Sequence, residues 1–420
     1  DILILPFCGD IQNEKYKSRY EKEYQKAHPG YYSVVLSDFG VEVELTATQR
    51  TAMHRYTFRK AEPAHILVDL QAYALIQYLI NQGYDARIVD YKPKGMGILY
   101  APINVPGFLK KIKRIMLNLL MLPSLLTRYK KREMFWKYIN KVLPMTDIVL
   151  SSGDLPCMDA YIVGSDQVWS ICFTGGIDNL YWGQFDRNGA KLISYAGSAA
   201  ENMGDSFYSN ENAKLLESFD FISVREKELQ GYLQTQIPNK KIEKVLDPTL
   251  MAGVDFFDEL IADEVPLEKK YVLVYQVIRT KDALISEYAK QIASRAGWDI
   301  VEIKNSRLYI CSQGKFSISK ELQNPTQFVS LFKYAQFVIT TSFHGTAFSL
   351  MFNRPFNVVS ISDEVDSRAK DLLMQLNLTD RLVSLPLNKV QKDVDWEGVN
   401  FKLQELRIPS REFLKKALRR

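Results

Sequence analysis

One of the four histidines of this chain lies where a strand-like run gives way to a helix-like one. His344 follows the apolar run 337–339 and precedes Gly345 and the apolar segment 347–352, which is long enough for two helical turns. In an open α/β sheet, ligands bind at the carboxyl ends of the strands, where such a bend lies. An imidazole at that place can donate or accept a proton near neutral pH. The local pattern leaves a second interpretation open, in which neighbouring backbone satisfies the histidine.

The elements that would position this residue alternate between strand and helix from about residue 71 onward. The amphipathic segment 71–84 contains Gly83, typical of a helix C-cap, and 85–93 follows as a strand. Helical segments such as 281–297 separate most of the later strands, which are predicted at 158–164, 191–197, 220–225, 241–247, 270–277, 298–304, 336–341 and 356–361. This alternation predicts an α/β protein with parallel sheets of Rossmann type.

Two boundaries divide the chain. The acidic stretch 253–270 separates a Rossmann-like domain over 71–252 from a second one over 253–420, which ends in a helix at 410–420. The first seventy residues differ, because apolar and polar residues alternate over three runs within 30–60 and turn residues separate them. Residues 1–70 are therefore predicted to be antiparallel β structure.

The composition is that of a soluble globular protein, with 46% hydrophobic and 25% charged residues. No apolar run reaches the roughly 18 residues of a membrane span, and the first seven residues lack the flank and cleavage site of a signal peptide. The four cysteines form no C-x-x-C pair and no histidine stands at metal spacing. We therefore expect a reducing, cytoplasmic location, with neither a disulfide framework nor a metal site.

Charge is unevenly distributed, although the formal net charge is only +5. Residues 91–132 contain no Asp or Glu, and basic residues bracket the apolar stretch 115–126. Such a segment predicts peripheral contact with an anionic membrane surface. The alternative is a helical pair with a solvated basic rim. Nucleic-acid binding is not predicted, since no known binding motif accompanies the charge.

Seven stretches, in this order, resemble the polysaccharide pyruvyl transferase family: "LQAYALIQYL", "YIVGSDQVWS", "KLISYAGSAA", "FISVREKE", "VLDPTLM", "VITTSFHGTAFSLMFNRPF" and "DSRAKDLLMQLNLTDR". The resemblance runs from about residue 71 to the C-terminus. It implies two Rossmann-like domains facing across a cleft, similar to GT-B glycosyltransferases. It also implies transfer of the enolpyruvyl carbon of phosphoenolpyruvate to two sugar hydroxyls, which forms a cyclic ketal and releases phosphate. Phosphoenolpyruvate is then a co-substrate, and no cofactor is needed.

The resemblance gives the residues around His344 a role in binding this donor. Phosphoenolpyruvate carries a phosphate and a carboxylate, so its site needs cations and backbone N–H groups, which a helix N-terminus helps to supply. The expected donor contacts here are Ser342, His344, Gly345 and Thr346, with N–H groups offered by residues 345–347. His344 would also act as an acid, either protonating the methylene carbon or assisting the departure of phosphate.

Arg225 is the best candidate for a second donor-binding and catalytic cation. It lies at a strand end in "FISVREKE", and a guanidinium can bind a carboxylate or phosphate through two parallel hydrogen bonds. Its alternative is a surface arginine paired with Glu226 or Glu228. Arg354 and Arg368 are weaker candidates, and Arg354 could instead cap the preceding helix.

Two acids compete as the base that deprotonates the acceptor hydroxyl, and Asp166 is the favoured catalytic residue of the two. Asp166 lies in the strand-exit loop "VGSDQVW", where Trp169 could stack on a sugar ring, so both are assigned to acceptor binding. Asp247 precedes a proline, which is more typical of a helix or turn cap. His344 itself is the third possibility. The acceptor would be a sugar of a polysaccharide or of a lipid-linked oligosaccharide.

The start of the chain resembles a different family. "VEVELTATQRTAMHRYTF", with "ILILPFCGD" and "AHPGYYSVVLSDFG", is similar to the N-terminal β-sandwich of glycoside hydrolase family 92 α-mannosidases. The calcium-binding catalytic domain of those enzymes has no counterpart here, so mannosidase activity is not implied. Near Leu70 the first strand and loop of the transferase family are replaced, and the strand-like run 65–70 could substitute for that strand. A nucleotide-sugar GT-B glycosyltransferase and an inactive fusion or carbohydrate-binding product remain as alternatives.

Overall fold

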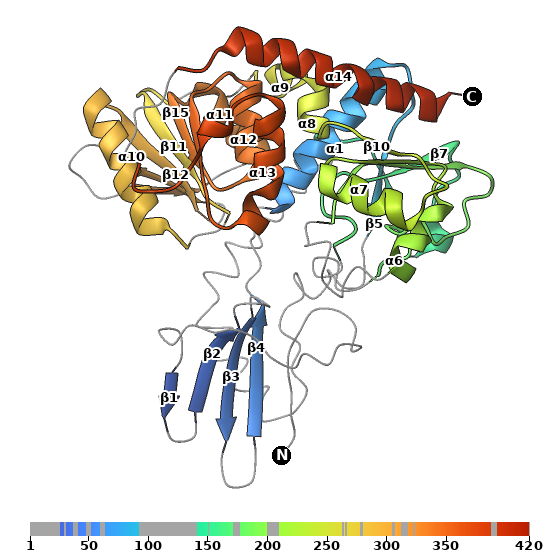
Figure 1. Ribbon diagram of the computed structural model, residues 1–420, viewed down its shortest axis with the longest axis horizontal. Coiled ribbons are helices and arrows are strands. Elements are labelled where there is room, and N and C mark those ends of the chain that lie inside the picture. The colour runs from blue at the N-terminus through green and yellow to red at the C-terminus, as the bar shows by residue number, and fades with distance from the viewer. Residues whose placement is uncertain are drawn as a thin grey trace.

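The computed structural model describes residues 26–28, 31–36, 41–47, 52–58, 64–91, 141–149, 151–170, 177–199, 210–262, 264, 267–277, 280–304, 307–311, 318–321, 324–387 and 393–419. Within them the chain is a mixed α/β protein with parallel sheets, as predicted (Figure 1). No helix among these residues is both long and apolar enough to cross a membrane. The basic segment predicted to contact a membrane, 107–132, lies outside the described residues.

Antiparallel strands form near the N-terminus, which confirms the prediction of antiparallel β structure there. They form one sheet in chain order: β1 (Lys26–His28), β2 (Tyr31–Leu36), β3 (Val41–Ala47) and β4 (Ala52–Phe58). Each neighbouring pair is antiparallel, with Tyr31 opposite Thr46 and Val41 opposite Phe58.

Helix α1 (Ala64–Asn81) follows this sheet and shows that the expectation of a strand at 65–70 is wrong. These residues are instead the first turns of the helix that was predicted from residue 71. Extending an existing helix does not repeat the cost of nucleating one, so the apolar run 65–70 joins it readily. Leu70 and Ala74 bury the same face of α1 in the core, and Gly83, with φ of +85°, ends the segment.

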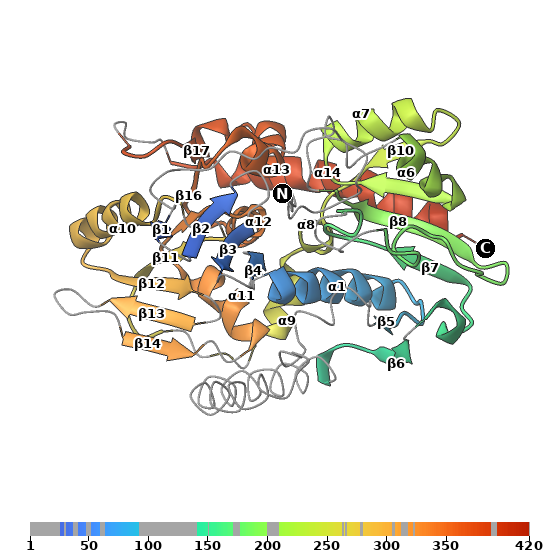
Figure 2. The same ribbon diagram turned by 90° about the horizontal axis from the view of Figure 1, so that it is seen from below.

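The first parallel sheet has the strand order β10-β9-β8-β7. Its elements are β7 (Ala160–Val163), β8 (Lys191–Gly197), α6 (Asn210–Leu215), β9 (Phe221–Val224), α7 (Lys227–Gln236) and β10 (Ile242–Lys244). A separate parallel pair, β5 (Ile88–Tyr91) with β6 (Met145–Val149), lies beyond α1 (Figure 2). Among the described residues, no strand before α1 joins either of these sheets.

The second sheet has the order β14-β13-β12-β11-β15-β16-β17, with parallel strands from β12 to β17 and an antiparallel edge at β13 and β14. Its strands are β11 (Tyr271–Tyr275), β12 (Asp299–Lys304), β13 (Arg307–Cys311), β14 (Ile318–Glu321), β15 (Phe337–Thr340), β16 (Phe356–Val359) and β17 (Leu382–Val383). Its helices are α10 (Asp282–Ala296), α11 (Pro325–Tyr334), α12 (Phe343–Met351) and α13 (Asp363–Gln375).

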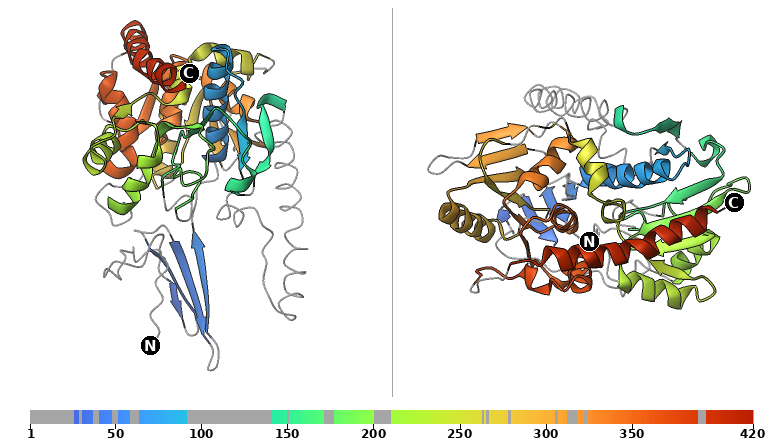
Figure 3. Two further views of the ribbon diagram at one scale, coloured as in Figure 1. Left: turned by 90° about the vertical axis from the view of Figure 1, so that its right-hand side faces the viewer. Right: turned by 90° about the horizontal axis from the view of Figure 1, so that it is seen from above.

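Two short helices link the two larger parallel sheets along the chain, and a third helix packs along both. The short helices α8 (Pro248–Ala252) and α9 (Val254–Leu260) follow β10, near the predicted boundary at 253–270. The last helix, α14 (Trp396–Leu418), runs along both sheets (Figures 1 and 3). One buried cluster contains residues of both sheets, including Ile193 of β8 and Val338 of β15. The described halves therefore share a core, while the division at 252 and 253 stays a prediction.

Candidate active site

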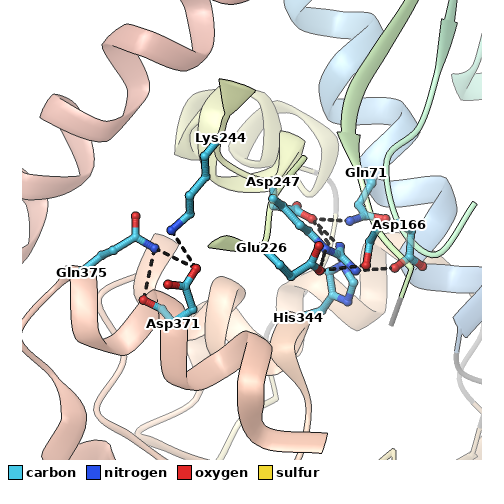
Figure 4. A network of polar contacts seen from close by, with 10 residues as sticks. Gln71, Asp166, Glu226, Lys244, Asp247, His344, Asp371 and Gln375 are labelled. Atoms are coloured by element: carbon cyan, nitrogen blue, oxygen red, sulfur yellow. Dashed lines mark hydrogen bonds and ion pairs between the residues drawn. The ribbon is translucent and has the colours of Figure 1, made fainter. Parts of the chain in front are cut away.

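Four of the sequence-predicted residues come from strand ends and lie in one buried cluster. Asp166 and Arg225 follow β7 and β9, and Asp247 lies between β10 and α8. His344 comes from the other sheet, in the first turn of α12 after β15. Figure 4 shows the side chains of Asp166, Asp247 and His344 turned toward one another. The carboxyl ends of parallel strands thus bring the predicted residues together.

Local geometry fixes both aspartates. Asp247 is the N-cap of α8, because its Oδ1 accepts a hydrogen bond from the Thr249 N–H at 3.0 Å and Pro248 occupies the first helical position. The predicted capping role of Asp247 is thereby confirmed. Asp166 has φ of +70°, in the left-handed region that aspartate tolerates better than most residues, and its backbone bridges to Gly197 of β8.

Arg225 is the centre of the cluster and is surrounded by carboxylates. Its Nη2 donates to Asp166 Oδ1 at 2.8 Å, its Nε to Glu226 Oε1 at 2.9 Å and its Nη1 to Asp247 Oδ2 at 3.0 Å. Only 2% of its side chain is exposed, and its guanidinium carbon lies 5.0 Å from the centre of the Phe343 ring. The suggested pairing with Glu226 exists, but it is buried and is one of three such contacts.

These contacts favour the charged forms of Asp166, Asp247 and Arg225. Burial alone would raise the pKa of Asp166, but the charges of Arg225, His344 and Arg368 outweigh it and lower that pKa. Burial is likewise overcome at Asp247, where His344 and Arg225 hold the pKa well below its usual value. Burial would lower the pKa of Arg225, but Glu226, Asp166 and Asp247 raise it. Neither aspartate is a strong base in this arrangement.

His344 is the least satisfied member of the cluster. It is 5% exposed, and its Nε2 lies 3.7 Å from Asp247 Oδ2, too far for a hydrogen bond. This nitrogen has no hydrogen-bond partner among the described residues. The alternative of a histidine satisfied through this nitrogen by neighbouring backbone is therefore not what the structure shows.

The start of α12 offers fewer free N–H groups than expected. The Thr346 N–H and Oγ1 both donate to the Ser342 carbonyl at 3.0 Å, so Thr346 is engaged inside the helix. Gly345 faces the protein, since a Cβ there would lie 2.2 Å from Thr340 Oγ1. The glycine therefore lets α12 pack closely on the end of β15. The backbone N–H groups of residues 343–345 remain as the helix N-terminus.

Trp169 does not offer a stacking surface in this structure. Its exposed fraction is 0%, its indole Nε1 donates to the Tyr181 carbonyl at 3.0 Å, and its ring packs against Trp182 and Phe219. A Cβ on Gly197 would lie only 2.8 Å from this ring. The expectation that Trp169 stacks on a sugar is corrected accordingly, because the ring belongs to the core of the first sheet.

Two further members of the cluster were not singled out as site residues from the sequence. The Gln71 amide on α1 donates to Asp247 Oδ2, and Glu226 also accepts from Ser198 Oγ at 2.8 Å. Gln71 was visible only as part of the stretch "LQAYAL". Several buried polar atoms around the cluster lack a hydrogen-bond partner among the described residues: Gln71 Oε1, Ser165 Oγ, Glu226 Oε2, Thr249 Oγ1, Tyr275 Oη and His344 Nε2. These buried atoms have hydrogen-bonding capacity that the described residues do not use.

A cavity of about 170 Å³ opens beside the cluster. Arg225, Asp247 and Phe343 line it on one side, with Arg368 and Asp371 of α13 on another. Arg368 makes no hydrogen bond or ion pair within the part of the chain that the structure describes; burial and the charge of Arg225 lower its pKa. Figure 4 shows Lys244 and Asp371 at this side, joined by a 2.7 Å ion pair.

The other weak candidate, Arg354, does not line this cavity. Its Nε donates to the Phe352 carbonyl at 2.8 Å, at the C-terminus of α12. This contact confirms the capping role that was considered for it.

The lowered pKa values predict a loss of stability in acid. A carboxyl whose folded pKa is depressed stabilises the folded state above its unfolded pKa, near 4, and loses this contribution as pH falls through the folded pKa. Asp247→Asn should therefore be less stable than wild type at pH 7, and the gap should shrink as pH falls below about 4. Urea unfolding at pH 7, 5, 4 and 3 measures it. Asp85→Asn, at an exposed ion pair with Arg87, is the matched control and should show no such gap.

Comparison with known families gives two matches. The polysaccharide pyruvyl transferase family model matches residues 69–363, which is more than half of the chain. The glycosyl hydrolase family 92 N-terminal domain matches residues 1–91. The two matches overlap over 69–91, which contains β5 and all of α1 except its first five residues. No curated protein matches the chain.

Proposed function

We propose, because the chain belongs to the polysaccharide pyruvyl transferase family, that it transfers the pyruvyl group of phosphoenolpyruvate to two hydroxyls of one sugar. The acceptor sugar belongs to a polysaccharide or its lipid-linked precursor, and the reaction takes place in the cytoplasm, at the inner membrane surface. The observation that carries the proposal is the buried cluster of Arg225, His344 and three carboxylates, with unpaired polar atoms around it.

The reaction balances without a cofactor. The methylene carbon of phosphoenolpyruvate gains a proton and becomes a methyl group, while the neighbouring carbon gains two C–O bonds to the sugar oxygens. The C–O bond to phosphate breaks, and phosphate leaves with the electron pair. The sugar hydroxyls release two protons. One balances the proton added to the methylene carbon, and the other ends on the phosphate, which leaves as hydrogen phosphate. The enzyme must supply an acid, a proton acceptor and a binding site for a strongly anionic donor.

His344 is the acid in this proposal. Its Nε2 is buried beside Asp247 and has no hydrogen-bond partner within the described chain, so it is available to a ligand. The negative charge of Asp247, 3.7 Å from this nitrogen, would stabilise the imidazole when it carries the proton.

The charges of the cluster change the expected role of Arg225. One guanidinium faces three carboxylates, so it holds Asp166, Glu226 and Asp247 in place and has little capacity left for an anion. We assign the main contact with the donor to Arg368, which lines the same cavity and has no ion-pair partner in the described residues. An arginine whose N–H groups make no ion pair is better suited to a phosphate or carboxylate than one that already donates to three carboxylates.

Asp166 remains the preferred group to accept the proton of the sugar hydroxyl. Both oxygens of Asp247 are engaged, one by the Thr249 N–H and the other by Arg225 and Gln71. Asp166 accepts the hydrogen bond from Arg225 at its Oδ1 atom. Its lowered pKa makes it a weak base, so it would take the proton only as positive charge develops at the sugar oxygen.

Phosphate release tests the proposal. Purified protein with phosphoenolpyruvate and a panel of galactosides and mannosides should release phosphate in step with ketal formation. Arg368→Gln should raise the KM for phosphoenolpyruvate roughly tenfold or more and leave the melting temperature unchanged. Lys290→Gln, on the exposed face of α10, is the control and should match wild type.

Two results would contradict the proposal. The first is an absence of phosphate release with every acceptor, together with tight calorimetric binding of UDP- or GDP-sugars, which would favour a nucleotide-sugar glycosyltransferase. The second is donor binding without turnover, which would favour an inactive fusion or carbohydrate-binding product. If the KM of Arg368→Gln for phosphoenolpyruvate were unchanged, the main contact with the donor would be assigned to Arg225 instead.

The same proposal includes the domain arrangement. We take the sheet β7–β10 and the sheet β11–β17 as the centres of two Rossmann-like domains, 71–252 and 253–420, that face each other in a GT-B-like way. Support comes from the cluster itself, since Arg225 comes from the first sheet and His344 from the second.

A further inference from the structure

Tyr275 is a buried titratable residue that the roles above do not use. It is the last residue of β11, in the middle of the second sheet, where it is paired with Ile303 on one side and Thr340 on the other. Its exposed fraction is 0%. Its ring packs edge-on against Phe328 and Phe332 of α11, with centroids 5.2 and 5.8 Å away. The ring therefore has a structural role.

The hydroxyl group of Tyr275 has no such role. Its oxygen is buried and has no hydrogen-bond partner in the described part of the chain. Tyr271, on the same face of the same strand, donates its hydroxyl to the Leu331 carbonyl at 2.8 Å. The buried Tyr195 hydroxyl donates to the Leu246 carbonyl at 3.1 Å. An unpaired buried hydroxyl destabilises a fold, so its presence calls for another explanation than packing.

The end of β11 lies next to the segment that leads into α12, because the Thr341 N–H donates to the Tyr275 carbonyl at 3.2 Å. Burial raises the pKa of Tyr275 well above its ordinary value, the side chain of Ser342 opposes this, and the charge of Asp166 adds to it. The phenol therefore stays protonated, and its O–H can donate a hydrogen bond to an anion. Ser342 is the N-cap of α12, whose first turn contains His344.

We propose that the Tyr275 hydroxyl donates a hydrogen bond to an anionic oxygen of the donor substrate bound at the N-terminus of α12. The inference rests on the proposed function and adds a residue to its donor site. A phosphate or carboxylate oxygen is the fitting partner, because it can accept hydrogen bonds from the backbone N–H groups at a helix start and from the phenol O–H together. The Tyr275 hydroxyl is then the donor of a hydrogen bond, and the ligand oxygen is its acceptor.

The test compares two tyrosine-to-phenylalanine variants of one strand. Tyr275→Phe removes only the unpaired oxygen and should leave the melting temperature unchanged or raise it. It should weaken binding of phosphoenolpyruvate roughly 10- to 100-fold, the usual effect of losing a hydrogen bond to a charged group. Tyr271→Phe removes a satisfied hydroxyl, so it should lower the melting temperature and leave donor binding unchanged. Thermal melts, calorimetry with phosphoenolpyruvate and with inorganic phosphate, and steady-state kinetics provide the readouts.

The outcomes separate this inference from the proposed function. Wild-type turnover with unchanged donor affinity and KM in Tyr275→Phe would overturn the inference and keep the function. Weaker anion binding in Tyr275→Phe without turnover by wild type would keep the inference and overturn the reaction. A fall in the melting temperature of Tyr275→Phe equal to that of Tyr271→Phe would show a structural hydroxyl and overturn the inference. Absence of binding of either anion to wild type would overturn both.

Discussion

Arg225→Met should lower the free energy of unfolding by about 3–5 kcal/mol, the usual effect of removing one partner from a buried ion pair. The loss is large because Asp166, Glu226 and Asp247 would remain buried with no cation to compensate them. Arg225→Lys should recover only part of it, since one ammonium cannot reproduce three directed hydrogen bonds. Chemical denaturation of both variants, with far-UV circular dichroism as the signal, measures these differences.

The control and the rescue for this prediction come from the same chain. Arg187 pairs with Asp220 at 2.6 Å, but both side chains are about a third exposed. Arg187→Met should therefore cost no more than about 1 kcal/mol. Adding Asp247→Asn to Arg225→Met should restore stability, because it removes one uncompensated charge. If the double variant were less stable than Arg225→Met alone, charge compensation would not be the function of Arg225.

His344→Ala should reduce the single-turnover rate by roughly 10²- to 10⁴-fold, the usual contribution of a general acid. Donor affinity should fall much less, because the backbone N–H groups of α12 and Arg368 remain. The melting temperature should change little, since the Nε2 of His344 makes no hydrogen bond with the described residues. Melting temperature, calorimetric affinity for phosphoenolpyruvate and single-turnover rate should be measured on the same preparation.

A second variant tests whether disturbing α12 alone would lower the single-turnover rate. Ser349 lies on the same helix, and its Oγ donates to the Gly345 carbonyl at 2.7 Å. Ser349→Ala disturbs the helix without touching the cluster, so it should lower stability and keep the rate. An early melt of His344→Ala with normal turnover would assign the histidine to packing, and the acid would have to be sought elsewhere.

The sequence predicted the scaffold of the site well, for a physical reason. Asp166, Arg225 and His344 each follow an apolar strand, so each lies at the carboxyl end of a parallel strand, the first two on one sheet and His344 on the other. The strand predictions needed only the apolar runs and their turn residues, so β8 was found at 191–197 and β15 within 336–341. Alternation of strands and helices was enough to predict parallel pairing.

What the sequence could not predict depends on contacts between distant residues. The burial of Trp169 depends on Gly197 of β8 and on Phe219, which precedes β9, and no local pattern reveals it. The contact of Gln71 with Asp247 joins positions 176 residues apart. The run 65–70 has β-forming composition, but its continuity with α1 overrides that preference.

The position of α14 has a consequence for how the protein is made. Its Ser410 accepts the Leu246 N–H at 2.8 Å, and its Arg407 and Arg411 donate to the Leu250 and Met251 carbonyls. Leu246 and Ser410 are 164 positions apart, so the ribosome needs roughly ten to thirty seconds between them at ordinary elongation rates. During that time α14 does not yet cover the region around α8, and the apolar surface of that region is exposed to other nascent chains. We therefore expect the newly synthesised first half to depend on a chaperone until α14 emerges.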